Sequence, residues 1–88
     1  MKKLTDENLD KISEIAVSSA ENFIFSKVSK KEIIDIDINV ELNYDKGLDV
    51  DVTVDIIFDD LSSADTNIAN EAADYAIEEI EKFLSNFN

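Results

Sequence analysis

The residues with the clearest chemical potential are carboxylates at every second position in the middle of the chain. Asp35, Asp37 and Asn39 reproduce the D-x-D-x-N start of a calcium-binding loop. Such a loop also needs Gly at its sixth position and Glu at its twelfth, and here those positions hold Val40 and Lys46. The first run of carboxylates is therefore not a calcium loop.

A second run begins at Asp49 and Asp51 and fails in the same way, with Val54 and Asp60 at the two diagnostic positions. Carboxylates two residues apart on a strand stand about 7 Å from each other, which is too far to chelate one ion without help. We expect no specific metal site and no cofactor. Weak association with Mg²⁺ or Ca²⁺ remains an alternative use of these acids.

Residue types that most enzymes need are missing. All eight basic residues are lysines, and the chain has no Arg, His, Cys or Pro. Histidine catalysis, thiolate metal sites and disulfides are excluded. The single glycine, Gly47, cannot form a glycine-rich phosphate loop. A two-layer domain of 88 residues also offers no obvious cleft for a pair of catalytic carboxylates. We expect no enzymatic activity.

The carboxylates alternate with apolar residues, and this period of two predicts two β-strands with one buried and one wet face. A three-residue loop at 45–47 pairs Tyr44 with Leu48 and, at the far end, Ile34 with Phe58, so every inward pair is apolar. We expect Gly47 to be left-handed in this turn. The inward residues are Ile34, Ile36, Ile38, Val40, Leu42, Tyr44, Leu48, Val50, Val52, Val54, Ile56 and Phe58.

The same register predicts an acidic outer face. Glu41 lies opposite Asp51, and Asp37 lies opposite Asp55, although like charges across a strand pair are destabilising. We interpret this face as a candidate binding surface for a protein with a basic surface, and solubility is the alternative explanation of the charge. The candidate partner-binding residues are Asp35, Asp37, Glu41, Asp49, Asp51 and Asp55.

Helical periodicity flanks the strands on both sides. The first helix begins after the N-cap Thr5, with Leu4 and Leu9 placed for a hydrophobic staple, and its exit is expected within 26–30. Phe25 lies off the apolar stripe of this helix. It is interpreted as a core residue or, alternatively, as a contact aromatic.

The second helix is expected to begin after Leu61. Ser62 is a plausible N-cap, with Asp65 three positions later. Glu78 and Lys82 have the i,i+4 spacing of a favourable ion pair.

These elements predict a single α+β domain over residues 1–88 with α-β-β-α order, a long antiparallel hairpin and both helices on one of its faces. Two strands alone form a marginal sheet with two open edges. We therefore expect a homodimer with a four-stranded sheet. The alternative is a monomer whose edges are guarded by acids and twist.

Charge and hydropathy limit the partners. The net charge is −13, so direct contacts with nucleic acid or anionic lipid are not expected. No apolar run reaches the ~20 residues of a membrane span, and no apolar region follows Lys2 and Lys3 as in a signal peptide. We predict a cytoplasmic protein that acts as a small acidic adaptor. A structural subunit that uses apolar edges in a larger assembly is the alternative.

Several segments together resemble a known family: residues 4–12, residues 23–33, the two alternating acidic strands and the Ala/Glu-rich second helix. They are similar to the small archaeal domain-of-unknown-function family numbered thirty-one ninety-four, and Phe25-Ser26-Lys27-Val28 is the most specific part. The resemblance implies an archaeal cytoplasmic protein and no assigned activity. A weaker likeness to the alkaline-shock protein family rests on element order, and that family usually adds a later strand.

Overall fold

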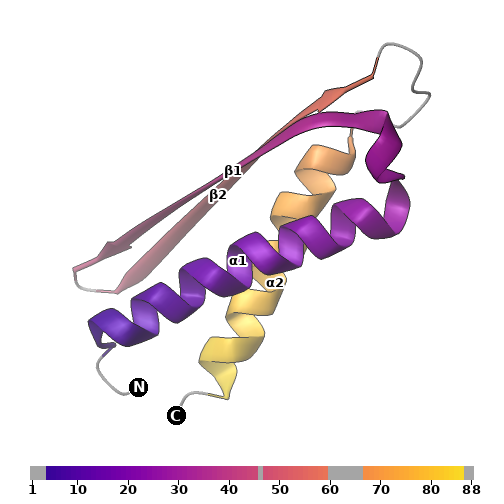
Figure 1. Ribbon diagram of the computed structural model, residues 1–88. Coiled ribbons are helices and arrows are strands. Elements are labelled where there is room, and N and C mark those ends of the chain that lie inside the picture. The colour runs from indigo at the N-terminus through magenta and orange to yellow at the C-terminus, as the bar shows by residue number, and fades with distance from the viewer. Residues whose placement is uncertain (1–3, 46, 60–66, 87–88) are drawn as a thin grey trace.

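The computed structural model describes residues 4–45, 47–59 and 67–86. Its elements are the helix α1 (Asp6–Lys27), a short 3₁₀ turn η1 (Lys30–Glu32), the strands β1 (Ile33–Tyr44) and β2 (Leu48–Phe58), and the helix α2 (Ile68–Ser85) (Figure 1). The predicted α-β-β-α order is confirmed. The helix α2 has Asn67 as N-cap, without a side-chain capping bond, and the proposed cap Ser62 lies outside the described residues.

The strands β1 and β2 pair in the predicted register over most of their length. Tyr44 faces Leu48, Val40 faces Val52, and the pairing continues in step to Ile36. At the open end of the hairpin the prediction was wrong, because an irregularity between Ile33 and Asp35 shifts the register. This β-bulge places an extra residue, Ile34, in β1, so Ile33 rather than Ile34 pairs with Phe58.

The turn between the strands has the predicted three residues but a different conformation. The backbone N–H of Asp45 donates to the carbonyl of Gly47 at 3.2 Å. No residue of the described part of the chain has a positive φ, so the expected left-handed Gly47 was wrong. The turn is closed instead by the bond between its first and last residues.

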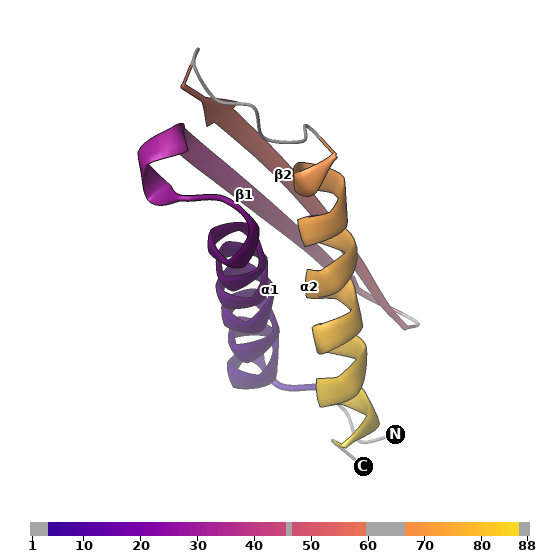
Figure 2. The ribbon, with the colours of Figure 1, turned by 90° about the vertical axis from the view of Figure 1, so that its right-hand side faces the viewer.

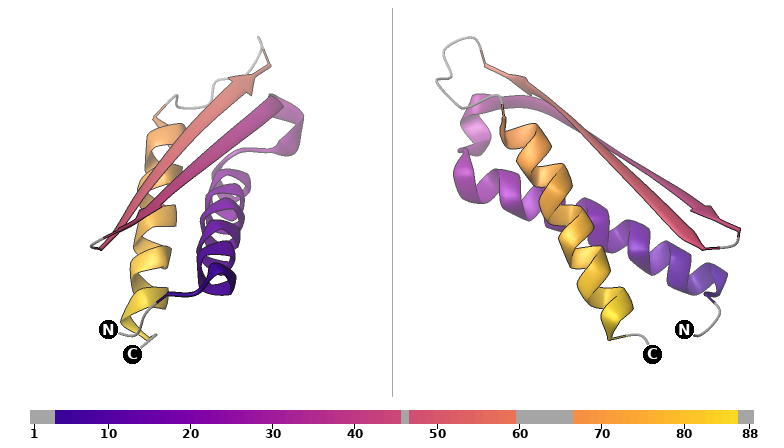
Figure 3. Two further views of the ribbon diagram at one scale, coloured as in Figure 1. Left: turned by 90° about the vertical axis from the view of Figure 1, so that its left-hand side faces the viewer. Right: turned by 180° about the vertical axis from the view of Figure 1, so that it is seen from behind.

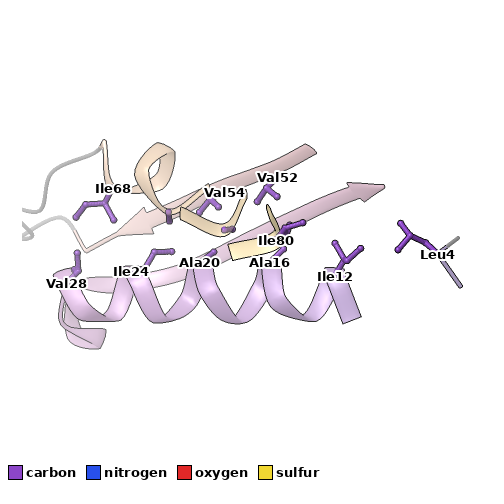
Figure 4. Close-up of a cluster of buried hydrophobic side chains, with 12 residues drawn as sticks. Leu4, Ile12, Ala16, Ala20, Ile24, Val28, Val52, Val54, Ile68 and Ile80 are labelled. Carbon is purple, nitrogen blue, oxygen red and sulfur yellow. The ribbon is translucent and has the colours of Figure 1, made fainter. Parts of the chain in front are cut away.

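Both helices cover the same face of the hairpin, and the opposite face is open (Figures 2 and 3). Each helix contributes a fully or almost fully buried stripe with i,i+4 spacing and the same order of residues, which Figure 4 shows beside Val52 and Val54. The alanines in the middle of each stripe are small and therefore allow the two helices to approach closely. Ridges with i,i+4 spacing that interdigitate favour a crossed packing of the helices. The two stripes are Ile12-Ala16-Ala20-Ile24 and Ile68-Ala72-Ala76-Ile80.

The N-terminal end of α1 is tied to the turn end of the hairpin. The predicted N-cap is confirmed, because the Thr5 side chain accepts a bond from the Asn8 backbone N–H and the Asn8 Oδ1 accepts one from the Thr5 backbone N–H. Leu4 is buried, as its place in the staple requires, and its backbone N–H donates to the Tyr44 hydroxyl at 3.1 Å. These contacts hold α1 against the inner face and leave the outer face free.

Candidate functional site

The outer face of the hairpin brings the predicted acidic residues together. All six candidate residues are exposed, and the carboxylates form cross-strand pairs, Asp37 with Asp55 and Glu41 with Asp51. Opposed residues in an antiparallel pair have Cα atoms only about 4.5–5.5 Å apart. The face therefore carries two acid–acid pairs, and between them lies one uncharged pair, Asn39 with Thr53.

The two ends of the acidic row differ. Near the turn, Asp49 faces Asn43, so this acid has a neutral partner across the strands. At the open end, Asp35 pairs with Ile57 beside the β-bulge, and its Oδ1 accepts a bond from the backbone N–H of Ile36 at 3.0 Å. Only the two central pairs thus place carboxylate against carboxylate.

The charge on this face is not balanced by lysines within the described ranges. The ion pair that the described ranges contain lies away from this face, on α2, where the Lys82 Nζ is 2.9 Å from the Glu79 Oε2. The hydrogen bond and charge of Glu79 raise the pKa of Lys82 above its usual 10.5. The sequence assigned this lysine to Glu78, so the predicted partner was wrong by one residue, and the pair has i,i+3 rather than i,i+4 spacing.

The acids do not converge on a point where a metal ion could sit. Within residues 4–45, 47–59 and 67–86, no group of three or more carboxylates has the arrangement of a metal site. A strand pair separates successive carboxylates along its length, because side chains on one face repeat every two residues. The arrangement instead offers an extended row of negative charge, which suits an extended basic surface better than a single ion.

The sequence analysis missed an apolar patch at the open end of the same hairpin. Ile34 is 66% exposed and Ile57 is 56% exposed. The β-bulge explains the exposure of Ile34, which is the extra residue in β1, whereas Ile57 is exposed because β2 keeps its regular alternation. A signal was present, because the doublets Ile33-Ile34 and Ile56-Ile57 break the alternation of the two strands at the same end.

A shallow hollow adjoins this patch along the free edge of β1. It is lined by Phe25 of α1, Lys30 of η1 and a part of β1 that includes Ile34. Phe25 is 38% exposed, which supports its interpretation as a contact aromatic rather than a core residue. The Lys30 Nζ lies 5.2 Å from the centre of the Phe25 ring, within the range of a cation–π contact.

Other aromatic residues in the described ranges, Phe23, Tyr44, Phe58 and Phe83, pack against the core. Phe58 and Phe83 are half-buried against it, and Phe23 stacks on Tyr75 with ring centres 5.5 Å apart. The sequence predicts that Phe87 is also a core residue, and this position lies outside the described residues. In the part of the chain that the structure describes, neither helix is long and apolar enough to cross a membrane.

Comparison with known proteins agrees with the fold. An uncharacterized protein of Methanothermobacter thermautotrophicus is 42% identical over 87 residues, covering 99% of this chain and 96% of that protein. The solution structure of the hypothetical protein mth677 from that organism is also 42% identical, with a TM-score of 0.88 over 100% of this chain and 97% of its own.

A crystal structure from Thermococcus onnurineus NA1 shares the fold, with a TM-score of 0.81 at 24% identity over 99% of this chain and 85% of its own. The family model described as "Protein of unknown function (DUF3194)" matches residues 1–83. These residues include both helices nearly in full and the whole acidic hairpin. The chain therefore belongs to this family of proteins of unknown function, as its resemblance implied.

Proposed function

We propose that this chain is a single non-enzymatic domain that acts in the cytoplasm as an adaptor and binds a basic protein through the outer face of its hairpin. The observation that carries the proposal is the pair of cross-strand acid–acid contacts, Asp37 with Asp55 and Glu41 with Asp51, with no lysine paired to them in the described residues. The surface that binds is formed by Asp35, Asp37, Glu41, Asp49, Asp51 and Asp55.

The physical basis is relief of repulsion. Like charges directly across a strand pair are destabilising by roughly the same ~0.2–1 kcal/mol that a favourable pair contributes. A Lys or Arg of a partner that sits between two opposed carboxylates turns this repulsion into attraction. Such a row of charge also steers a basic partner during encounter, so binding should depend steeply on ionic strength.

The test uses charge reversal on the outer face. Tagged protein is incubated with native lysate and washed at about 50 mM and about 1 M salt, where the screening lengths differ by several-fold. We expect a protein with a basic surface to be retained at low salt and lost at high salt, and the doubly substituted Asp37→Lys/Asp51→Lys variant to lose it at both.

The matched control is Asp10→Lys/Glu14→Lys, which changes the charge by the same amount on the exposed side of α1. This control should retain the partner at low salt. If both double variants lose the partner equally, net charge rather than the outer face is responsible. If Asp37→Lys/Asp51→Lys binds as the unchanged protein does, the proposal is wrong.

A second candidate is self-association into a four-stranded sheet, the assembly that a structural subunit would use. The edge of β2 favours this candidate. A β-bulge protects a strand edge from pairing, and the bulge of this hairpin lies in β1, between Ile33 and Asp35, so the edge of β2 lacks that protection. Pairing of two acidic strands should strengthen with salt, since salt screens like charges, whereas binding of a basic partner should weaken. Sedimentation equilibrium at both salt concentrations distinguishes the two: a mass of one chain throughout would contradict the dimer.

A further inference from the structure

The large apolar side chains that remain exposed in the described residues gather at one end of the hairpin. They are Ile34, Ile57 and Phe25, and we call them the anchor patch. Ile57 pairs with Asp35, the residue that follows Ile34 at the β-bulge, and Phe25 and Ile34 line the same shallow hollow. The three residues therefore lie near one another at the open end of the hairpin, and α1, β1 and β2 each contribute one of them.

Folding does not require this exposure. Ile34 and Ile57 stay largely in water and gain little from the hydrophobic effect, so polar residues at these two positions would serve the fold equally well. A β-bulge re-aims side chains out of the regular alternation, and contiguous exposed apolar residues with a polar rim are typical of binding surfaces. Lys30 and Glu21 provide such a rim, because both line the hollow beside Phe25.

The anchor patch and the acidic pairs lie in line on the hairpin. Asp55 is two residues from Ile57 along β2, and Asp51 is six residues from it. At about 3.3 Å per residue, these acids stand roughly 7 Å and 20 Å from the apolar end of the face. A ligand that follows the strands would meet an apolar site first and two acid pairs afterwards.

We propose that the anchor patch receives one large apolar side chain from an extended basic segment of a partner protein. Lys or Arg two and six residues further along that segment reach the Asp37–Asp55 and Glu41–Asp51 pairs, because an extended segment has the same rise per residue as β2. This inference rests on the proposed function and specifies the partner segment that the acidic face binds.

Charge selects this occupant over the two other candidates. A second copy of the chain also carries a net charge of −13, so it would bring acids toward the acidic row. A membrane with anionic headgroups is repelled by the same row. A basic polypeptide is attracted by it, and only a polypeptide can place an apolar group and cations at fixed spacings.

The experiment uses three fluorescein-labelled peptides of about twelve residues in a Ser/Thr background. The matched peptide carries Phe and, two and six residues later, Lys. The first control peptide has Ser in place of Phe. The second has the same composition as the matched peptide but places Lys one and five residues after Phe, which turns the lysines to the other side of an extended chain. Binding to the full-length protein is measured by fluorescence anisotropy at low salt.

We expect the matched peptide to bind roughly tenfold to hundredfold more tightly than the Ser-containing control, as burial of one large apolar side chain implies. The Ile34→Ser/Ile57→Ser variant should lose this difference and keep the weaker, charge-driven binding. The control variant Val17→Ser, at a half-buried apolar position on α1 away from the hairpin, should keep the full difference. Circular dichroism checks that each variant folds.

Several results would overturn the inference. Equal affinities for the Phe-containing and Ser-containing peptides, with binding still abolished by Asp37→Lys/Asp51→Lys, would leave the proposed function standing without the apolar anchor. Binding unaffected by Asp37→Lys/Asp51→Lys would contradict the proposed function itself. A self-association, or binding to phosphatidylcholine vesicles, that Ile34→Ser/Ile57→Ser removes would assign the patch to a second copy or to a membrane instead.

Discussion

The two faces of the hairpin are built from the same twenty-odd residues and follow opposite rules. The inner face packs apolar residues such as Val52 and Val54 against both helices, and both valines are buried. The outer face sets Asp37 against Asp55 and Glu41 against Asp51 in water. The inner face therefore stabilises the fold, while the outer face lowers stability and makes the surface available for binding.

The acidic face also helps to specify the fold that it weakens. A slip of one residue in a β-strand exchanges its two faces. In this hairpin a slip would move the carboxylates of one strand under the helices, where a charge without a partner is very costly. The acids thus exclude the alternative register, although each contributes unfavourably to the correct one.

The largest effect is expected where an acid crosses from one face to the other. Val52→Asp places a carboxylate under the helices with no cation beside it. Burial of an unpaired charge costs several kcal/mol, a large part of the roughly 5–15 kcal/mol by which a domain is stable. We expect Val52→Asp to unfold the protein or to remove most of its stability, measured by urea denaturation.

The neighbouring position provides the control. Thr53→Asp adds the same carboxylate on the outer face, where it faces Asn39 in water. Its effect should stay within ~0.5 kcal/mol, as for ordinary surface substitutions. Similar losses of stability in the two variants would show that the helices do not make the difference between the faces.

Alternation alone was sufficient to predict the two faces, since the period of two assigns each residue between Ile36 and Leu48 to its observed side. It failed at the open end of β1, where the inward residue is Ile33 and not the predicted Ile34, whereas in β2 it placed Ile56 inward correctly. Whether Ile33 or Ile34 faces inward depends on the position at which the chain leaves η1 and enters β1. The backbone N–H of Asp59 donates to the Glu32 carbonyl at 2.8 Å and fixes that position. This contact is tertiary and has no signal in the sequence.

The candidate site was predictable to the same extent. The acids followed from the alternation, whereas the anchor patch depends on the bulge and on Phe25 reaching the edge of β1 from another element. The turn shows a similar limit. Its length followed from keeping Tyr44 opposite Leu48, but its conformation did not follow from the presence of Gly47.

A smaller effect is expected from relief of one acid–acid pair. Asp55→Asn removes the charge opposite Asp37 and keeps the size of the side chain. We expect the variant to be more stable than the unchanged protein by about 0.2–1 kcal/mol at low salt. The gain should fall toward zero near 1 M salt, where the screening length is ~3 Å.

Asp49→Asn is the matched control, because Asp49 is equally exposed but faces the neutral Asn43. Both substitutions change the net charge by the same amount. A larger stabilisation by Asp55→Asn therefore isolates the cross-strand term from the general repulsion of an acidic protein. Equal gains would assign the cost of the outer face to net charge rather than to the opposed pairs.

The smallest effect concerns the ion pair on α2 between the exposed Lys82 and the half-buried Glu79, which is attractive, unlike the acid–acid pairs on the hairpin. Glu79 raises the pKa of Lys82, so Lys82 holds its proton more tightly in the folded chain than in the unfolded one. The stability from this pair is present below pH 10.5 and is lost as the pH rises through the raised pKa of the folded state.

Lys82→Gln should therefore unfold at slightly lower urea than the unchanged protein near pH 8, and the difference should shrink as the pH rises through the raised pKa of Lys82. Lys11→Gln on α1 removes an exposed lysine without an observed ion pair and is the control. A difference that persists at high pH would show that Lys82 acts through the packing of its methylene groups. Because Lys82 is 71% exposed, solvent screens this pair, and its loss should change stability less than removal of the charge on Asp55 does. The larger electrostatic effect on stability would then lie on the outer face of the hairpin.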